Sequence, residues 1–182
     1  MNGVEYVLGI DGGGTSTIAW LAVREGRQGF EAIGVGRAGP SNMRIVGFQQ
    51  ASRNVEIAIE QALESAGMER RQIRCLCLAM AGSDRPAERN QWQAWAGVSQ
   101  LASRHVIVTN DAVPVIYSAD AGGQGVALIV GTGSLALGRT PQGTTARSGG
   151  CGPLIGDEGS GYAIAVSGLR AIANAADGRG ET

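Results

Sequence analysis

The first 35 residues alternate between apolar runs and short polar or glycine-rich segments. The apolar runs cover residues 6–11, 15–23 and 30–35. Gly12-Gly13-Gly14 separates the first two runs and Arg24-Glu25-Gly26-Arg27 separates the last two. Segments of this kind are typical of tight turns, so the pattern predicts a meander of three strands.

Residues 43–66 change to the period of a helix. Ser41 and Asn42 are suited to cap its start, and Gly67 is suited to end it, because glycine accepts the left-handed backbone that follows many helices. We expect one long helix here, with apolar positions at helical spacing: Val46, Val55, Ile59 and Leu63.

Strands and helices alternate from residue 73 onward. Strand-like runs at 73–80 and 106–109 are each followed by a helical pattern, at 86–99 and 112–119. Such alternation indicates a largely parallel sheet with crossover helices, and therefore an α/β fold.

The order of elements seen at the start of the chain is then repeated. After a glycine-rich turn, strand patterns cover residues 126–130, 134–139 and 144–148, and a helical pattern covers 158–175. A repeat of this kind predicts two units of one topology. We expect a first domain over residues 1–120 and the beginning of a second, incomplete domain over 121–182.

Composition favours a small-molecule partner. The net charge is −1 and 43% of the residues are hydrophobic, so neither nucleic acid nor an anionic membrane is expected as a partner. No run approaches the roughly 20 apolar residues of a membrane span, and the N-terminus lacks the pattern of a secretion signal, so a cytoplasmic location is expected. All fifteen basic residues are arginine, which excludes a Walker-type P-loop because that loop needs a lysine.

The three cysteines and the one histidine suggest no metal site. Cys75 and Cys77 lie on the same face of an apolar run but lack the spacing of zinc ligands, and Cys151 stands alone. We interpret all three as small buried hydrophobic residues. His105 opens the next apolar run and is interpreted as a strand-end residue.

Two glycine turns have the composition of phosphate-binding loops. Asp11 ends a strand before Gly12-Gly13-Gly14-Thr15, and Gly131-Thr132-Gly133-Ser134 occupies the equivalent place in the second copy. Glycines allow backbone amides to approach a polyphosphate, and Asp11 is placed to hold magnesium. Two such turns facing each other would clamp a nucleotide, although a plain hairpin turn remains the alternative for each.

Three other segments bear on the chemistry. Asn110-Asp111 follows a strand, where a carboxylate could take the proton of an attacking hydroxyl or merely cap the next helix. The glycine-rich loop at 149–161 ends in Asp157 and Glu158, which could bind a polyol or simply favour the helix dipole. Residues 34–39 match the glycine motif of dinucleotide-binding loops, but no helix follows them directly, so we assign them to a loop.

In this order, these segments resemble the N-acetylglucosamine kinase family and the related BadF-type ATPases of the actin and hexokinase superfamily. The resemblance implies an RNase H-like first domain with a mixed sheet, a second domain of the same topology, and MgATP in the cleft between them. The segments that carry it are Asp11-Gly12-Gly13-Gly14-Thr15, Ser41-Asn42, Ala81-Gly82-Ser83-Asp84, Thr109-Asn110-Asp111-Ala112, Gly131-Thr132-Gly133-Ser134 and Gly156-Asp157-Glu158-Gly159-Ser160.

The resemblance also assigns residue roles. It implies that Asp111 is the general base on an amino-sugar hydroxyl and that Asp11 organises magnesium. Contacts to the ATP phosphates are implied for Gly13, Gly14, Thr15, Gly131, Thr132 and Gly133. Contacts to the sugar, N-acetylglucosamine or glucosamine, are implied for Asn42, Gly82, Ser83, Cys151, Gly152 and Asp157.

The resemblance has two departures. Cys151 stands where relatives carry a tryptophan, and the chain is shorter than family members, so we expect a C-terminal truncation with weak or absent kinase activity. Two alternatives follow: an ATPase that couples hydrolysis to a partner protein, or a non-catalytic fragment. Because an incomplete sheet exposes an edge and apolar surface, a homodimer is a further expectation.

Overall fold

The computed structural model describes residues 4–26, 29–70, 73–99 and 105–180, so Arg27 of the expected turn lies outside it. The chain divides into two compact units, Met1–Asp111 and Ala112–Thr182. Each unit is described here by itself.

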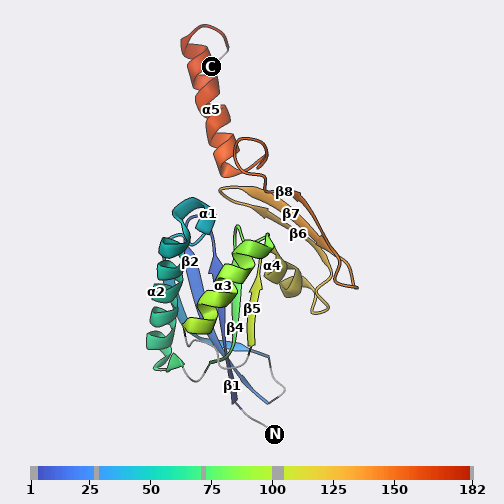
Figure 1. The fold of residues 1–182 in the computed structure, drawn as a ribbon. Helices are drawn as coiled ribbons and strands as arrows, with labels where there is room; N and C mark the ends of the chain where they lie inside the picture. Colours follow the sequence, from blue (N-terminus) through green and yellow to red (C-terminus); the bar gives the residue numbers. More distant parts are fainter. Residues whose placement is uncertain (1–3, 27–28, 71–72, 100–104, 181–182) are drawn as a thin grey trace. The chain divides into compact units, whose positions relative to one another are not determined.

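Unit 1 contains a mixed five-stranded sheet in the order β3-β2-β1-β4-β5 (Figure 1). The expected meander is confirmed, because β1 pairs antiparallel with β2 and β2 with β3. Strands β1, β4 and β5 run parallel, as the alternating pattern predicted. The strands are β1 (Val4–Gly12), β2 (Thr17–Glu25), β3 (Glu31–Ala38), β4 (Ile73–Met80) and β5 (His105–Thr109).

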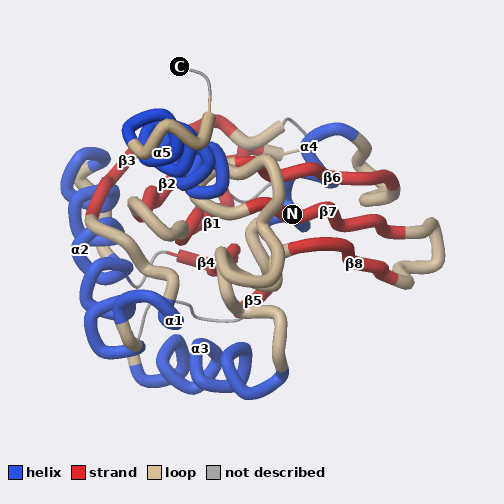
Figure 2. The backbone as a smooth tube through the Cα atoms, turned by 90° about the horizontal axis from the view of Figure 1, so that it is seen from above, coloured by secondary structure: helices blue, strands red, loops and turns tan. Residues whose placement is uncertain are grey.

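Helices cover one face of this sheet. α2 (Phe48–Ala66) and α3 (Pro86–Val98) lie on the same side of it (Figure 2). Strand alternation buries every second side chain under these helices, and the resulting core includes Leu8, Leu21, Ile59, Leu76 and Trp92.

The prediction of a single helix over residues 43–66 is wrong. The structure has a short helix α1 (Met43–Val46) and then α2, with Gly47 between them at a φ of 77°. Only glycine adopts that conformation readily, so the chain changes direction there. The expected ends are confirmed: Asn42 caps α1, and Gly67 ends α2 in the left-handed conformation.

The assignment of residues 34–39 to a loop is also wrong, because β3 continues to Ala38. Gly34 and Gly36 face α2, whose backbone lies very close to them. A Cβ at Gly36 would lie 1.9 Å from the Ala58 carbonyl oxygen, and one at Gly34 would lie 2.3 Å from that of Ala62. These glycines therefore serve the contact between helix and sheet.

Unit 2 begins with α4 (Ala112–Ala119) and a three-stranded antiparallel sheet in the order β6-β7-β8. Ala112 and Ile116 of α4 pack against Ala127 and Leu137 of the sheet. The three strands repeat the meander of unit 1. The mixed sheet of unit 1, together with its helices, confirms the expected α/β class. The strands of unit 2 are β6 (Gly125–Val130), β7 (Ser134–Arg139) and β8 (Thr145–Gly149).

The last helix, α5 (Gly161–Ala176), starts later than expected and buries none of its residues. Its N-cap is Ser160, whose hydroxyl accepts a hydrogen bond from the Ala163 amide. The expectation that Asp157 and Glu158 lie in its first turn is therefore wrong, because both precede the cap. In the part of the chain that the structure describes, no helix is long and apolar enough to cross a membrane.

Candidate active site

The candidate site of unit 1 lies where its parallel strands end. Asp11, Ala79 and Thr109 are paired across β1, β4 and β5, so they form one row. Neighbouring strands are about 4.8 Å apart, which puts the backbones of Asp11 and Thr109 about 10 Å from each other. Asp111 follows Thr109 by two residues, so both carboxylates of the predicted site are brought to one edge of the sheet.

The first glycine turn is tied to its surroundings through its backbone. The Gly13 amide donates to the Ser16 carbonyl at 2.9 Å, and the Gly13 carbonyl accepts from the amides of Ser41 and Asn42 at 3.0 Å each. A Cβ on Gly12 would lie 2.3 Å from the Met80 methyl and 2.5 Å from Ser41 Oγ, so Gly12 packs closely against both side chains. The turn and the segment before α1 therefore form one connected structure, with Gly14 and Thr15 at its tip.

Thr17 and Ser41 are residues of this site that the sequence interpretation missed. Both are fully buried. The Thr17 hydroxyl lies 2.7 Å from the Gly39 carbonyl oxygen and 2.7 Å from Ser41 Oγ. A signal was available, because Thr17 shares the strand parity of Ala19 and Leu21, which predicts a hydroxyl facing the core and in need of a partner.

Three of the expected sugar-contacting residues gather beside that segment. Asn42 Oδ1 accepts from the Arg44 amide at 3.1 Å, and a Cβ on Gly82 would lie 2.6 Å from the same oxygen. Ser83 is fully buried, and its hydroxyl has no hydrogen-bond partner among the described residues. Buried polar groups are normally paired, so the Ser83 hydroxyl has the capacity to bind a buried water.

Asn110 connects this cluster to Asp111. Its side-chain amide donates to Asp84 Oδ1 at 2.8 Å, and Asn110 is 3% exposed. The bond joins the loop after β4 to the end of β5. It therefore restrains the backbone that carries the candidate base.

Asp11 differs electrostatically from an ordinary surface carboxylate. The residue is exposed overall, but it stands on the face of β1 opposite the helices, and partial burial of its carboxyl raises its pKa. An oxygen donor of this kind, at a strand end beside a glycine turn, fits a magnesium ion, which takes one or two carboxylates together with substrate phosphates.

The second glycine turn, in unit 2, is held by the loop that precedes α5. The Ser134 amide donates to Asp157 Oδ1 at 3.2 Å, and the Ser134 hydroxyl donates to the Glu158 carbonyl at 2.9 Å. The Gly161 amide donates to the Gly131 carbonyl at 2.8 Å. Thr132 is exposed between these anchored positions, so unit 2 presents the tip of its turn as unit 1 does.

Cys151 and Gly152 lie near the start of the same loop, before the residues that hold the turn. Cys151 is exposed, so interpreting it as a buried hydrophobic residue is wrong. Gly152 has a φ of 93°, and its carbonyl accepts from the Gly156 amide at 3.0 Å, which closes a small turn. Leu154 and Ile155 are 91% and 82% exposed.

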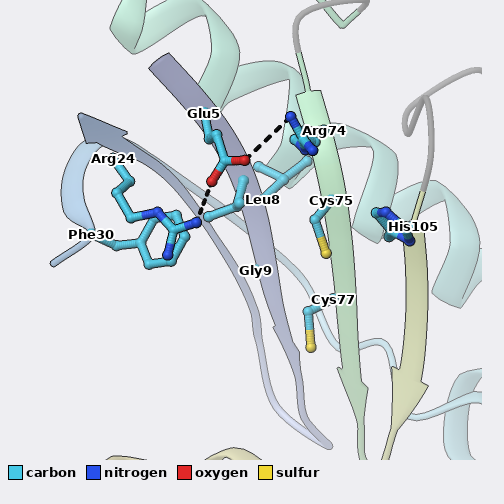
Figure 3. Close-up of a pocket in the computed structure, with 10 residues that line it drawn as sticks. Glu5, Leu8, Gly9, Arg24, Phe30, Arg74, Cys75, Cys77 and His105 are labelled. Carbon is cyan, nitrogen blue, oxygen red and sulfur yellow. Dashed lines mark hydrogen bonds and ion pairs between the residues drawn. The ribbon is translucent and has the colours of Figure 1, made fainter. Parts of the chain in front are cut away.

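The other two cysteines line a hollow of about 400 Å³ in unit 1, shown in Figure 3. Cys75 and Cys77 lie on the sheet face without helices and are partly exposed, so the expectation of full burial is wrong for them too. Burial still raises the pKa of both thiols. His105 borders the same hollow, at the start of β5 as expected; among the described residues no group of three metal-binding side chains is found.

A comparison with protein families gives one match over most of the chain. The model of the BadF/BadG/BcrA/BcrD ATPase family matches residues 8–182. Two characterised relatives are each 32% identical to this chain. They are the N-acetylmuramic acid/N-acetylglucosamine kinase of Clostridium acetobutylicum and the N-acetyl-D-glucosamine kinase of Dictyostelium discoideum. They match 98% and 95% of this chain, which spans only 56% of the length of each.

A solved structure has the same fold. The structure of a candidate N-acetylglucosamine kinase from Chromobacterium violaceum superposes with a TM-score of 0.75 over 98% of this chain and 60% of that one. At 24% identity this likeness shows the fold alone.

Proposed function

This chain belongs to the BadF/BadG/BcrA/BcrD ATPase family, as its motifs predicted, and we propose that it serves ATP-dependent phosphoryl transfer to a hydroxyl of an amino sugar. The observation that carries the proposal is the shared sheet edge of unit 1. Parallel pairing there brings Asp11 with its glycine turn and Asn110-Asp111 to the ends of neighbouring strands. One carboxylate stands beside a phosphate-type turn and the other beside the candidate sugar cluster.

Asp111 is the proposed general base. It would accept the proton of the sugar hydroxyl as that oxygen bonds to the terminal phosphorus and the bond from phosphorus to ADP breaks. The hydrogen bond from Asn110 to Asp84 supports this role because it fixes the backbone next to Asp111. Asn42, Gly82 and Ser83 are the proposed sugar-contacting residues of this unit.

The two glycine turns are the proposed phosphate sites. Gly13, Gly14 and Thr15 in unit 1, and the turn over residues 131–133 in unit 2, would direct backbone amides and threonine hydroxyls at the phosphates. Asp11 would hold magnesium, which when bound supplies positive charge that offsets the charge on the transferring group. Cys151, Gly152 and Asp157 are proposed as the sugar contacts of unit 2.

The alternative is an ATPase that couples hydrolysis to a partner protein. The family name favours it, and the exposed apolar residues of α5 would suit a partner surface. The kinase is preferred because Asn42 accompanies Asp111 in this chain and because both characterised relatives named above are amino-sugar kinases.

ATP consumption by the purified chain distinguishes these functions. We expect any magnesium-dependent turnover by this chain to be weak and to require N-acetylglucosamine or glucosamine. It should fall 100-fold or more in Asp111→Asn, since general acid–base groups contribute about 10²–10⁴-fold. Asp120→Asn is the control for loss of a carboxylate. Turnover that does not depend on the sugar would support the ATPase. Sugar-dependent turnover that is unchanged in Asp111→Asn would refute the role of Asp111 as the base.

A further inference from the structure

Asp157 is at the centre of the contacts between the glycine-rich loop and the second glycine turn. Its Oδ1 accepts from the Ser134 amide at 3.2 Å, and its own carbonyl accepts from the Ser160 amide at 3.1 Å. It is 7% exposed. Its carboxylate therefore has a partner within unit 2 before any ligand binds.

The backbone of Asp157 is also unusual. Its φ is 59°, and it is the only residue other than glycine with a positive φ in the described part of the chain. Side chains disfavour this conformation, and it persists where surrounding contacts hold it, often at functional sites. Asparagine and aspartate tolerate it best, but glycine would be the simplest choice if conformation alone mattered.

Gly133 provides the third observation. A Cβ on Gly133 would lie 2.9 Å from Asp157 Oδ2, so the carboxylate lies directly against the backbone of the turn. By contrast, a Cβ on Gly131 would meet no atom within 4 Å. The close approach is therefore specific to the position that faces Asp157.

We propose that Asp157 is a positioning residue for the turn over residues 131–134. One carboxylate oxygen holds the Ser134 amide and the other packs under Gly133, so together they set the direction of the remaining amides of the turn. This rests on the proposed function only in taking that turn as a phosphate site. A sugar that binds Asp157 would share the group that holds the turn, which would couple sugar binding to nucleotide binding.

Asp157→Gly is the decisive variant, because glycine keeps the positive φ and removes only the carboxylate. Asp157→Asn retains an oxygen acceptor and tolerates the same backbone. Glu158→Gln is the matched control, since Glu158 is exposed and joins this cluster through its backbone carbonyl. A second pair of variants tests the same contact by changing the turn. Gly133→Ala is the test variant and Gly131→Ala is its control.

Hydrogen exchange at the Ser134 amide tests positioning without any ligand. We expect about tenfold faster exchange in Asp157→Gly and in Gly133→Ala, and a change of less than about threefold in Asp157→Asn and both controls, because the oxygen that accepts from the Ser134 amide is removed or displaced only in the first two. Unchanged exchange in Asp157→Gly would overturn the proposal. If that variant fails to fold, the glycine pair decides the question by the same criterion.

Calorimetric titration with MgATP tests the consequence. We expect the Kd of Asp157→Gly to rise about tenfold while that of Glu158→Gln stays at the wild-type value, since a misplaced turn loses amide contacts to the phosphates. A wild-type chain that does not bind MgATP would count against the proposed function, and the exchange experiment would still decide the role of Asp157. Wild-type affinity in Asp157→Gly would overturn the link to nucleotide.

Discussion

Asp11, the proposed magnesium ligand, carries a cost in stability. Partial burial raises the pKa of its carboxyl in the folded protein. The folded state then binds the proton more tightly than the unfolded chain does. This group's contribution to stability consequently falls as pH rises from the unfolded pKa through the higher folded one. When it is ionised, the carboxylate is incompletely solvated, a condition that a bound cation would relieve.

Asp11→Asn should therefore melt at a higher temperature than the wild type at pH 7 when no ligand is present. The difference should shrink at pH values below about 3.8, where the carboxyl is protonated in both states. MgATP should raise the melting temperature of the wild type and do so less for Asp11→Asn. Thermal scans at the two pH values test this, and a lower melting temperature for the variant at pH 7 would contradict it.

At this scale the sequence predicted that Asp11 and Asp111 lie at one edge of the sheet, but not how the side chains around them pair. Asp11 and Asp111 were found because strand ends are readable from the hydrophobic pattern and parallel strands end at one edge. The pairing of Thr17 with Ser41 was missed because it joins residues 24 positions apart. The contact of Asp157 with Ser134 escaped for the same reason, since a turn and a loop 23 residues apart have no common local signal.

At the scale of elements, the strand-and-helix pattern was predictable and its interruptions were less so. β4, α4 and β7 have the expected bounds, because their apolar runs end in polar or glycine residues. The break at Gly47 was missed, since one glycine in a helical pattern is often tolerated. The glycines of β3 were wrongly assigned to a loop. Glycine is needed there because α2, some twenty residues later in the chain, packs closely against the strand.

Replacing Gly36 with alanine should therefore destabilise unit 1 by about 2 kcal/mol or more. The new methyl would lie 1.9 Å from the Ala58 carbonyl and 2.7 Å from the Ala62 amide nitrogen. Both are backbone atoms of α2, so relief requires the helix to move, and overpacking of this kind costs about 1–3 kcal/mol.

Gly9→Ala is the matched control for Gly36→Ala. Gly9 also lies in a strand of this sheet, but a Cβ there meets nothing within 4 Å. The free energy of unfolding of Gly9→Ala should stay within about 0.5 kcal/mol of the wild-type value. Urea denaturation of the two variants measures the difference, and equal stabilities would show that α2 is not in close contact with β3.

At the scale of the whole chain, α5 and β6 of unit 2 expose several large apolar side chains. Ile164, Leu169 and Ile172 on α5 are 65%, 67% and 68% exposed, and Val126 and Leu128 on β6 are 79% and 68% exposed. In unit 1, by contrast, the long helix α2 buries seven of its residues. Exposed large apolar side chains that form a patch mark surfaces that associate with other protein surfaces.

We therefore expect this chain to self-associate through α5 at micromolar to millimolar concentrations. Sedimentation velocity over a concentration series should show growing oligomers in the wild type. The double variant Leu169→Glu with Ile172→Glu should sediment as a monomer over the same range, because charge on the apolar positions opposes their burial. Arg170→Glu changes charge on the same helix without removing an apolar side chain and should behave as the wild type does. Oligomers that persist in the double variant would place the contact elsewhere, and the exposed residues of β6 would be the next to change.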